Sequence, residues 1–181
     1  MNPPRFVYPG CVVAHLHRVL LRIYRRLPAF ARRSIVRRLA PQYTAGAICL
    51  VERPDGKVLL IRQSYRNHWG LPGGLLRRHE TPEDAAVREI AEEVGLAIEL
   101  ISEPVVVLDP EPRRIDIVFR ARPAAGSDIA GARPMSPEIV EVAWFALTDL
   151  PRLQHETAQA VQALARASYS PPARPLRDAA S

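Results

Sequence analysis

Cysteine, lysine and long apolar runs are all scarce in this sequence. Cys11 and Cys49 are its only cysteines. Two isolated cysteines provide no disulfide framework, so we expect a protein of the reducing cytoplasm. Cys49 lies within the apolar run AICLV, which predicts that its side chain is buried in the core. No apolar run approaches the roughly 18 residues that a transmembrane helix needs, so the sequence predicts no membrane span.

Acidic residues are absent from residues 1–40, which contain nine arginines. The formal net charge of +6 therefore comes from this segment, whereas the rest of the chain is mildly acidic. The segment does not resemble a signal peptide. Two histidines interrupt its apolar stretch, most of its positive charge follows that stretch, and it lacks a small-residue cleavage site. Because arginine replaces lysine almost everywhere in the chain, a codon bias is enough to explain that preference.

Two helices, each with an apolar side and an arginine-rich side, are predicted within residues 1–41. The first runs from Cys11 to Leu27, and the second begins at Pro28 and ends before Pro41. Two interpretations of this basic helical extension stay open. Either the helices dock their apolar stripe on the rest of the protein, or they contact an anionic membrane or a nucleic acid.

Residues 42–167 show the mixture of strand and helix patterns that is typical of an α/β domain. The predicted strands are 44–52, 57–63, 96–101, 104–108, 114–122 and 139–146, and the predicted helices are 81–95 and 153–167. The turn Pro54-Asp55-Gly56 predicts that the first two strands form a hairpin. Residues 168–181, in which three prolines lie among small and charged residues, are predicted to form a disordered tail.

The strand at 114–122 alternates apolar with charged residues. Its charged side holds Asp116, Arg120 and Arg122. Such alternation is typical of a strand with one buried and one exposed face. We therefore expect Asp116 on the exposed face.

The helix at 81–95 is well specified at both ends. Thr81 is a good N-cap, Pro82 suits the first helical position, and Gly95 favours a left-handed stop. Side chains follow one another at about 100° around a helix. One predicted face is apolar and holds Val87, Ile90, Ala91 and Val94. Another face is acidic and holds Glu89, Glu92 and Glu93.

The acidic face predicts a bound cation. Glu89 and Glu93 are four residues apart and repel each other, and neither is followed four positions later by a basic residue. A bound cation would relieve this repulsion. Because the available ligand atoms are all oxygen, Mg²⁺ is the favoured ion, with Mn²⁺ as an alternative.

The residues around this helix resemble the signature of the Nudix hydrolases. Gly74 is followed by five residues, Glu80, seven residues and then the run Arg88-Glu89-Ile90-Ala91-Glu92-Glu93-Val94-Gly95-Leu96. Every fixed position of the signature is present. The resemblance implies a mixed β-sheet sandwiched between helices, to which residues 1–41 add the basic extension. It also implies hydrolysis of a nucleoside diphosphate that is linked to another group.

The same resemblance implies roles for the residues of the signature. The catalytic candidates are Arg88, Glu89, Glu92 and Glu93. Glu92 and Glu93 are expected to bind the metal, and Glu89 to be a further ligand or the base that activates water. Arg88 is expected to orient the glutamates through an ion pair, since it precedes Glu92 by four residues.

Other candidates complete the predicted site. The carbonyl of Gly74 is a candidate metal ligand, and Glu138 is a candidate for a further acidic ligand from outside the signature. Candidates for contact with the substrate are three arginines and an aromatic side chain that can stack on a base: Arg62, Arg66, Arg77 and Tyr65. These residues do not distinguish among ADP-ribose, oxidised deoxynucleoside triphosphates, dinucleoside polyphosphates and nucleotide sugars.

Two classes of function stay open at this point. The first is a Mg²⁺-dependent enzyme that cleaves the diphosphate linkage of a nucleoside diphosphate derivative. The second is a non-catalytic nucleotide sensor on the same fold, in which the basic extension binds nucleic acid or a membrane. Either protein can be a homodimer.

Overall fold

The computed structural model describes residue 18 and residues 21–169. Most of the predicted first helix and nearly all of the predicted tail lie outside the described residues. The chain divides into two compact units, residues 1–42 and residues 43–181. Within the described residues, no helix is both long and apolar enough to span a membrane.

The first unit contains the predicted second helix. Residues 21–26 are helical, and α2 (Ala29–Leu39) follows, with Pro28 at its N-cap position. The prediction that Pro28 starts this helix is therefore confirmed. No residue of α2 is buried. Phe30 and Leu39 of this helix are 72% and 79% exposed.

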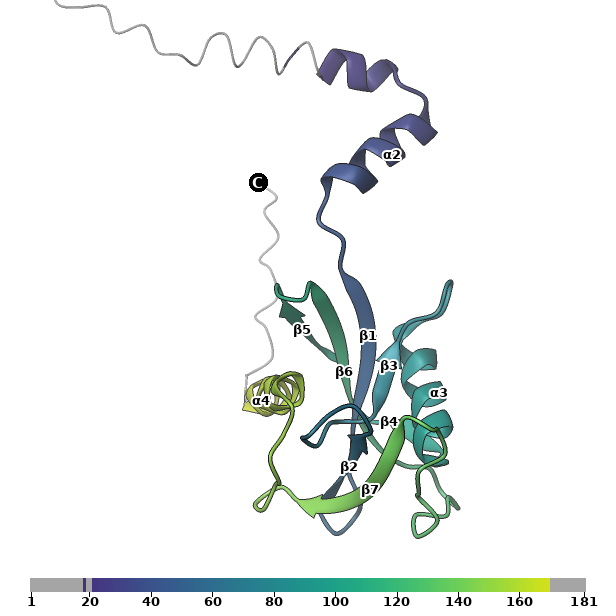
Figure 1. Ribbon diagram of the computed structural model, residues 1–181, viewed down its shortest axis with the longest axis vertical. Coiled ribbons are helices and arrows are strands. Elements are labelled where there is room, and N and C mark those ends of the chain that lie inside the picture. Colours follow the sequence, from purple (N-terminus) through teal and green to yellow (C-terminus); the bar gives the residue numbers. More distant parts are fainter. Residues whose placement is uncertain (1–17, 19–20, 170–181) are drawn as a thin grey trace, which may run out of the picture. The chain divides into compact units, whose positions relative to one another are not determined.

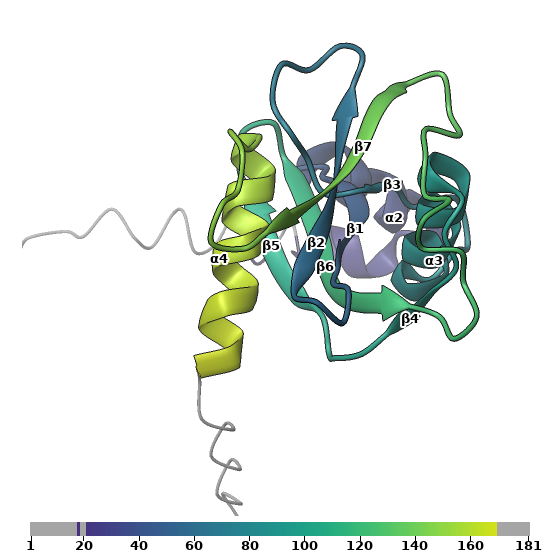
Figure 2. The same cartoon turned by 90° about the horizontal axis from the view of Figure 1, so that it is seen from below.

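The second unit consists of two β-sheets between two helices. The larger sheet has the strand order β3-β1-β6-β4, and β5 also pairs with β6; the smaller sheet pairs β2 with β7. Figures 1 and 2 show α3 and α4 on opposite sides of the strands. The bounds are β1 (Thr44–Val51), β2 (Lys57–Gln63), β3 (Gly73–Leu75), α3 (Pro82–Val94), β4 (Ile98–Leu100), β5 (Val105–Asp109), β6 (Arg114–Pro123), β7 (Ile139–Ala146) and α4 (His155–Tyr169). The predicted α/β fold is confirmed.

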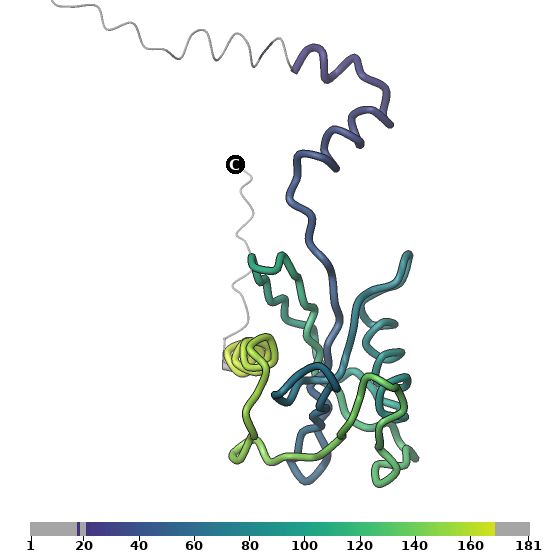
Figure 3. The backbone as a smooth tube through the Cα atoms, in the orientation of Figure 1, coloured from purple at the N-terminus to yellow at the C-terminus, as the bar shows by residue number. Residues whose placement is uncertain are grey.

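The predicted hairpin between β1 and β2 forms only next to its turn, where Glu52 bridges Val58 in an antiparallel arrangement and the Arg53 N–H donates to the Lys57 carbonyl at 2.8 Å. The turn itself forms, because the Gly56 N–H donates to the Arg53 carbonyl at 2.9 Å. After it the strands separate, and β1 pairs with β3 and β6 whereas β2 pairs with β7 (Figure 3). Both strands are apolar on both faces, with continuous burial over residues 46–51 of β1 and 58–61 of β2. Each strand therefore has two faces that have to be buried. Because the strands belong to separate sheets, apolar side chains can pack between them.

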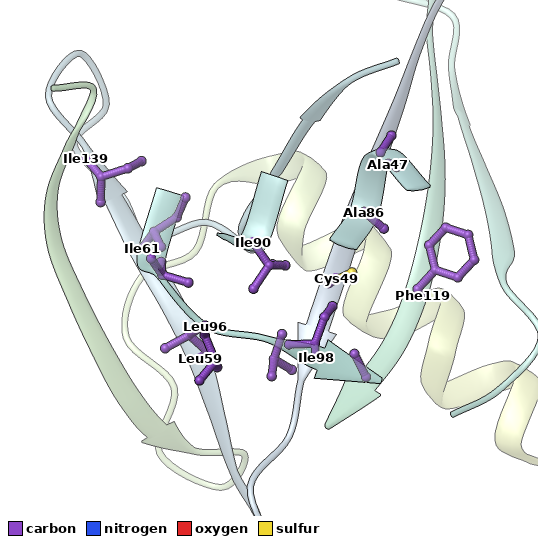
Figure 4. Close-up of a cluster of buried hydrophobic side chains, with 14 residues drawn as sticks. Ala47, Cys49, Leu59, Ile61, Ala86, Ile90, Leu96, Ile98, Phe119 and Ile139 are labelled. Atoms are coloured by element: carbon purple, nitrogen blue, oxygen red, sulfur yellow. The ribbon is translucent and has the colours of Figure 1, made fainter. Parts of the chain in front are cut away.

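Two apolar clusters fill the second unit. The first lies between the sheets and α3, where Ala86 and Ile90 of the helix face Cys49 and Phe119 (Figure 4). The second includes Ile48 and Val118 together with residues of α4. The prediction that Cys49 is buried is confirmed, and burial raises the pKa of its thiol to about 12.

The prediction that Asp116 lies on an exposed face is wrong, since Asp116 is buried. The reason is the central position of β6, which has β1 on one edge and β4 and β5 on the other. Its apolar residues also belong to both core clusters, Phe119 to the first and Val118 to the second. Neither face of β6 is therefore left to solvent in its middle.

The ends of α3 are as predicted, but its buried face differs. The Thr81 hydroxyl accepts a hydrogen bond from the Asp84 N–H at 3.2 Å, and Gly95 ends the helix with φ 70°. Val87 and Ala91 are exposed, whereas Glu93 is buried. Glu93 is buried because it faces the backbone of β3, a contact that helical periodicity alone does not reveal.

Candidate active site

A cavity of about 470 Å³ lies where β3 and β6 meet the amino-terminal part of α4 and the glutamates of α3. Segments that are distant in the sequence contribute to its wall. The lining residues with polar or glycine character are Gln63, Tyr65, Arg66, Gly73, Gly74, Glu89, Glu93, Arg114, Asp116, Glu138, Glu156 and Thr157. Four of the predicted metal ligands lie in this wall: Gly74, Glu89, Glu93 and Glu138.

Glu93 is the buried carboxylate of the site. It is 8% exposed, and one of its oxygens accepts a hydrogen bond from the Gly73 N–H at 2.8 Å. Burial is the largest cause of a rise in the pKa of Glu93 to about 8. The negative charges of Glu89, Glu138 and Glu92 add to this rise, and the Gly73 N–H opposes it. Burial and the neighbouring carboxylates therefore both disfavour the charged form of Glu93.

Gly74 and Glu89 fit closely together at the edge of the cavity. A Cβ atom at residue 74 would lie 2.5 to 2.7 Å from the carboxylate atoms of Glu89. Only glycine therefore lets the carboxylate occupy this place beside the β3 backbone. The nearby Arg88 Nη1 holds one Glu89 oxygen at 2.6 Å.

Arg88 connects the glutamates of the signature. Its guanidinium donates to Glu80 at 2.6 and 2.9 Å, to Glu89 at 2.6 Å and to Glu92 at 3.1 Å. The Arg88 hydrogen bonds, together with one from the Arg77 N–H, lower the pKa of Glu80 to about 2. The expected repulsion is relieved at Glu89 and Glu92, because Arg88 binds both, whereas the charge of Glu89 still raises the pKa of Glu93.

Glu92 and Arg77 lie outside the cavity lining. The Arg77 Nη2 lies 3.0 Å from both carboxylate oxygens of Glu92, and both side chains are largely exposed. Glu92 is thus shared between Arg77 and Arg88. A cation that binds Glu92 would have to compete with these two guanidinium groups.

The predicted substrate contacts separate into two groups. Tyr65 and Arg66 border the cavity, and Arg66 pairs with Glu156 of α4 at 3.2 Å. Arg62 instead pairs with Glu141 across the smaller sheet at 2.6 and 2.8 Å and does not border the cavity.

Sequence reasoning missed five polar residues of the cavity wall: Gln63, Arg114, Asp116, Glu156 and Thr157. Arg114 and Asp116 come from β6, and Thr157 comes from α4. The Thr157 hydroxyl is buried and accepts a hydrogen bond from the Leu71 N–H at 3.0 Å. The available signal was Asp116, a carboxylate in the middle of a strand whose other neighbours suit a core.

The donor set fits a hard divalent cation in its chemistry. Its side-chain ligand atoms are carboxylate oxygens, which Mg²⁺ and Mn²⁺ prefer. Burial is the main cause of the raised pKa of Glu93, and the charges of Glu89, Glu138 and Glu92 add to it. Within the part of the chain that the structure describes, no three Asp, Glu, His or Cys side chains are already grouped as metal ligands. Arginines bind Glu89 and Glu92 instead.

Comparison with known proteins identifies the family to which this site belongs. The model of the NUDIX domain matches residues 42–165. The chain is 33% identical over 105 residues to a MutT-like protein of Streptomyces ambofaciens, an alignment that covers 58% of this chain and 65% of that protein. It is 35% identical over 118 residues to an ADP-ribose pyrophosphatase of Methanocaldococcus jannaschii, which covers 61% and 67% respectively. The chain thus spans less than two thirds of the Streptomyces relative.

A solved structure agrees with these sequence matches. The MutT NUDIX hydrolase of Burkholderia pseudomallei matches with a TM-score of 0.57 and 33% identity, over 68% of this chain and 99% of that chain. The family match over residues 42–165 includes every residue that borders the cavity and the whole carboxylate cluster. On this agreement of signature, fold and family model, the chain belongs to the Nudix hydrolase family.

Proposed function

We propose that this protein hydrolyses the diphosphate linkage of a nucleoside diphosphate derivative with the help of Mg²⁺ or Mn²⁺. The observation that carries the proposal is the burial of Glu93 beside Glu89 in the wall of the 470 Å³ cavity. Burying a carboxylate among other carboxylates destabilises a fold unless the site has a use for them. A cavity of this size accommodates a small molecule.

The chemistry requires a water oxygen to bond to phosphorus while the P–O bond of the anhydride breaks. The electron pair of that bond stays on the departing phosphate, and the water loses a proton. A divalent cation would neutralise phosphate charge and lower the pKa of water. The residues that we propose to hold it are Gly74, through its carbonyl, Glu89, Glu92, Glu93 and Glu138.

The chain's own side chains supply the remaining functions. Glu89 borders the cavity, and we propose it as a ligand or as the acceptor of the water proton. Arg88 fixes the positions of Glu89 and Glu92 through hydrogen bonds of 2.6 and 3.1 Å. Tyr65 and Arg66 at the cavity rim are our candidates for contact with the nucleoside and the phosphates.

The test is product release from a panel of nucleotides in the presence of Mg²⁺. The panel contains ADP-ribose, an oxidised deoxynucleoside triphosphate, a dinucleoside polyphosphate and a nucleotide sugar. We expect the wild type to cleave at least one compound, and Glu92→Gln and Glu93→Gln to lower kcat by about 100-fold or more. Glu83→Gln is the matched control, because Glu83 is an exposed acid in the first turn of the same helix.

The outcomes separate the two classes of function. Equal rates for the wild type, Glu92→Gln and Glu93→Gln would refute the catalytic assignment. Nucleotide binding without cleavage of any panel compound would favour a non-catalytic sensor.

For the basic extension we propose contact with an anionic membrane. Between Leu21 and Ala40 the first unit has an apolar groove of about 670 Å³, and α2 also carries four arginines: Arg32, Arg33, Arg37 and Arg38. Exposed apolar side chains beside arginines suit the boundary between headgroups and acyl chains. Nucleic acid needs the arginines but has no use for exposed Phe30 and Leu39, so these two residues favour the membrane.

A further inference from the structure

Arg114 and Asp116 form an ion pair in the cavity wall that the mechanism above does not use. Both side chains come from β6 and border the cavity. The Arg114 Nε lies 2.7 and 2.9 Å from the two carboxylate oxygens of Asp116. Asp116 is 4% exposed, whereas the Arg114 side chain is 29% exposed. The carboxylate is therefore an anchor, and the guanidinium remains accessible from the cavity.

The neighbouring strand leaves space for this pair. Gly46 of β1 is the direct partner of Asp116 in the parallel ladder between β1 and β6. A Cβ atom at residue 46 would lie 2.6 Å from Asp116 Oδ1 and 3.0 Å from Arg114 Nη2. Contacts this short are not tolerated, so a side chain at residue 46 would displace the pair. The position of the guanidinium thus depends on two adjacent strands.

The terminal nitrogens of Arg114 remain available to a ligand. A guanidinium carries five N–H donors, and the hydrogen bonds to Asp116 use only the Nε donor. Among the described residues, Asp116 is the partner of every side-chain hydrogen bond that Arg114 donates. Its terminal N–H groups match the spacing of two phosphate oxygens, which is the arrangement that makes arginine a bidentate phosphate ligand.

An anionic ligand of this cavity needs cationic hydrogen-bond donors, because the cavity wall is rich in acids. The cavity lining holds two arginines, Arg66 and Arg114, and a larger number of acids: Glu89, Glu93, Glu138, Glu156 and Asp116. Arg66 follows β2 in a loop and already pairs with Glu156. Arg114 instead projects from a strand that is paired on both edges, and a rigid element positions a ligand group more accurately than a loop does.

We propose that Arg114, positioned by Asp116, binds a phosphate group of the substrate. The inference rests on the proposed function in one respect, namely that the ligand of the cavity carries a diphosphate. Asp116 is a positioning residue, because it acts on the ligand only through Arg114. Gly46 is required because it leaves the space that both side chains occupy.

The experiment measures phosphate binding separately from turnover. Imidodiphosphate has an N–H group in place of the bridging oxygen of a diphosphate, so it resists hydrolysis. It has no nucleobase, so its binding reports on the phosphate contacts alone. Its dissociation constant is measured by titration calorimetry in the presence of Mg²⁺ for the full-length wild type and for Arg114→Gln, Arg114→Lys and Asp116→Asn. The matched control is Arg122→Gln, because Arg122 lies on the same strand and forms a similar ion pair with Glu99 at 2.8 and 3.0 Å outside the cavity.

We expect Arg114→Gln to weaken imidodiphosphate binding by about 10- to 100-fold, the loss of a hydrogen bond to a charged group. Arg114→Lys keeps the charge without the planar fork and is expected to lie between Arg114→Gln and the wild type. Asp116→Asn is expected to weaken binding less than Arg114→Gln does. Arg122→Gln is expected to bind as the wild type does.

The inference is overturned if Arg114→Gln binds imidodiphosphate as tightly as the wild type does, or if the wild type does not bind it. It is also overturned if Arg122→Gln weakens binding as much as Arg114→Gln does. Thermal unfolding of each variant shows whether it is folded, and Arg114→Lys carries the test if Arg114→Gln is not. An enzyme that cleaves panel compounds but fails this test keeps the proposed function and loses only the role of Arg114.

Discussion

At the scale of single residues, the absence of a side chain at Gly74 allows the Glu89 carboxylate to lie beside the β3 backbone. We predict that Gly74→Ala lowers kcat by about 100-fold, because its Cβ would lie 2.5 to 2.7 Å from the Glu89 carboxylate and displace it. The backbone of Gly74 has no positive φ, so alanine can adopt the same backbone conformation there. The measurement is steady-state kinetics on a substrate found in the panel.

Gly56→Ala is the matched control for this prediction. Its backbone has φ 78°, and nothing lies within 4 Å of an added Cβ. The substitution is expected to cost about 1 kcal/mol of stability or more through backbone strain and to leave kcat unchanged. A Gly74→Ala enzyme with wild-type kcat would show that the position of Glu89 is unimportant.

The lowered pKa of Glu80 predicts how the stability of the fold depends on pH. Hydrogen bonds from Arg88 and from the Arg77 N–H lower its pKa from an ordinary 4.5 to about 2 in the folded protein. A carboxyl whose pKa is lower in the folded state stabilises the fold above its unfolded pKa, and that stability is lost as the pH falls through the folded pKa. We therefore expect the stability advantage of the wild type over Glu80→Gln to shrink between about pH 6 and about pH 3.

Urea unfolding at both pH values measures this advantage. The difference between the two proteins cancels the titration of groups that do not share Arg88 with Glu80. An advantage that stays constant over this range would contradict the ion pair with Arg88.

At the scale of elements, one buried hydrogen bond ties α4 to the segment that leads into β3. The Thr157 hydroxyl accepts from the Leu71 N–H at 3.0 Å, and both residues are buried. We predict that Thr157→Val lowers the free energy of unfolding by about 1 to 3 kcal/mol, because it leaves a buried N–H without an acceptor. Urea unfolding measures the loss.

Thr157→Ser keeps the hydroxyl and separates the hydrogen bond from packing. It is expected to lose less stability than Thr157→Val, although it removes a methyl group that Thr157→Val retains. The reverse order would mean that packing, and not the hydrogen bond, holds α4 in place.

At the scale of the whole molecule, the prediction concerns the basic extension. We expect the full-length protein to co-sediment with vesicles that contain phosphatidylglycerol, and to do so less at high salt. Replacement of Phe30 and Leu39 with serine is expected to abolish this binding, because both side chains are exposed and apolar. The control replaces Val106 and Leu108 of β5, which are 65% and 56% exposed, with serine.

RNA binding separates the membrane from the rival partner. A contact with nucleic acid depends on the arginines of the extension and would survive the replacement of Phe30 and Leu39. Binding to RNA but not to vesicles would overturn the membrane proposal. None of these replacements is expected to change turnover.

The local features of this protein were predictable from sequence because neighbouring residues determine them. The ends of α3 depend on Thr81 and Gly95, which act within a few residues of the helix. The burial of Cys49 depends on the apolar run around it. Strand and helix positions depend on periodicity, and the strands at 57–63 and 139–146 have the predicted bounds. The signature from Gly74 to Leu96 was sufficient to predict the family.

Contacts between distant segments decided the rest, and they leave no local pattern. β2 pairs with β7 and not with β1, because β1 and β2 each have two apolar faces that have to be buried. The burial of Asp116 follows from the strands beside β6, and the relief of the glutamates follows from the path of Arg77 and Arg88. Sequence by itself determined the carboxylate cluster and the class of chemistry that it suits. Only the tertiary structure placed Arg114 in one cavity with Glu89 and Glu93, because segments that are distant in the sequence have to meet to form its wall.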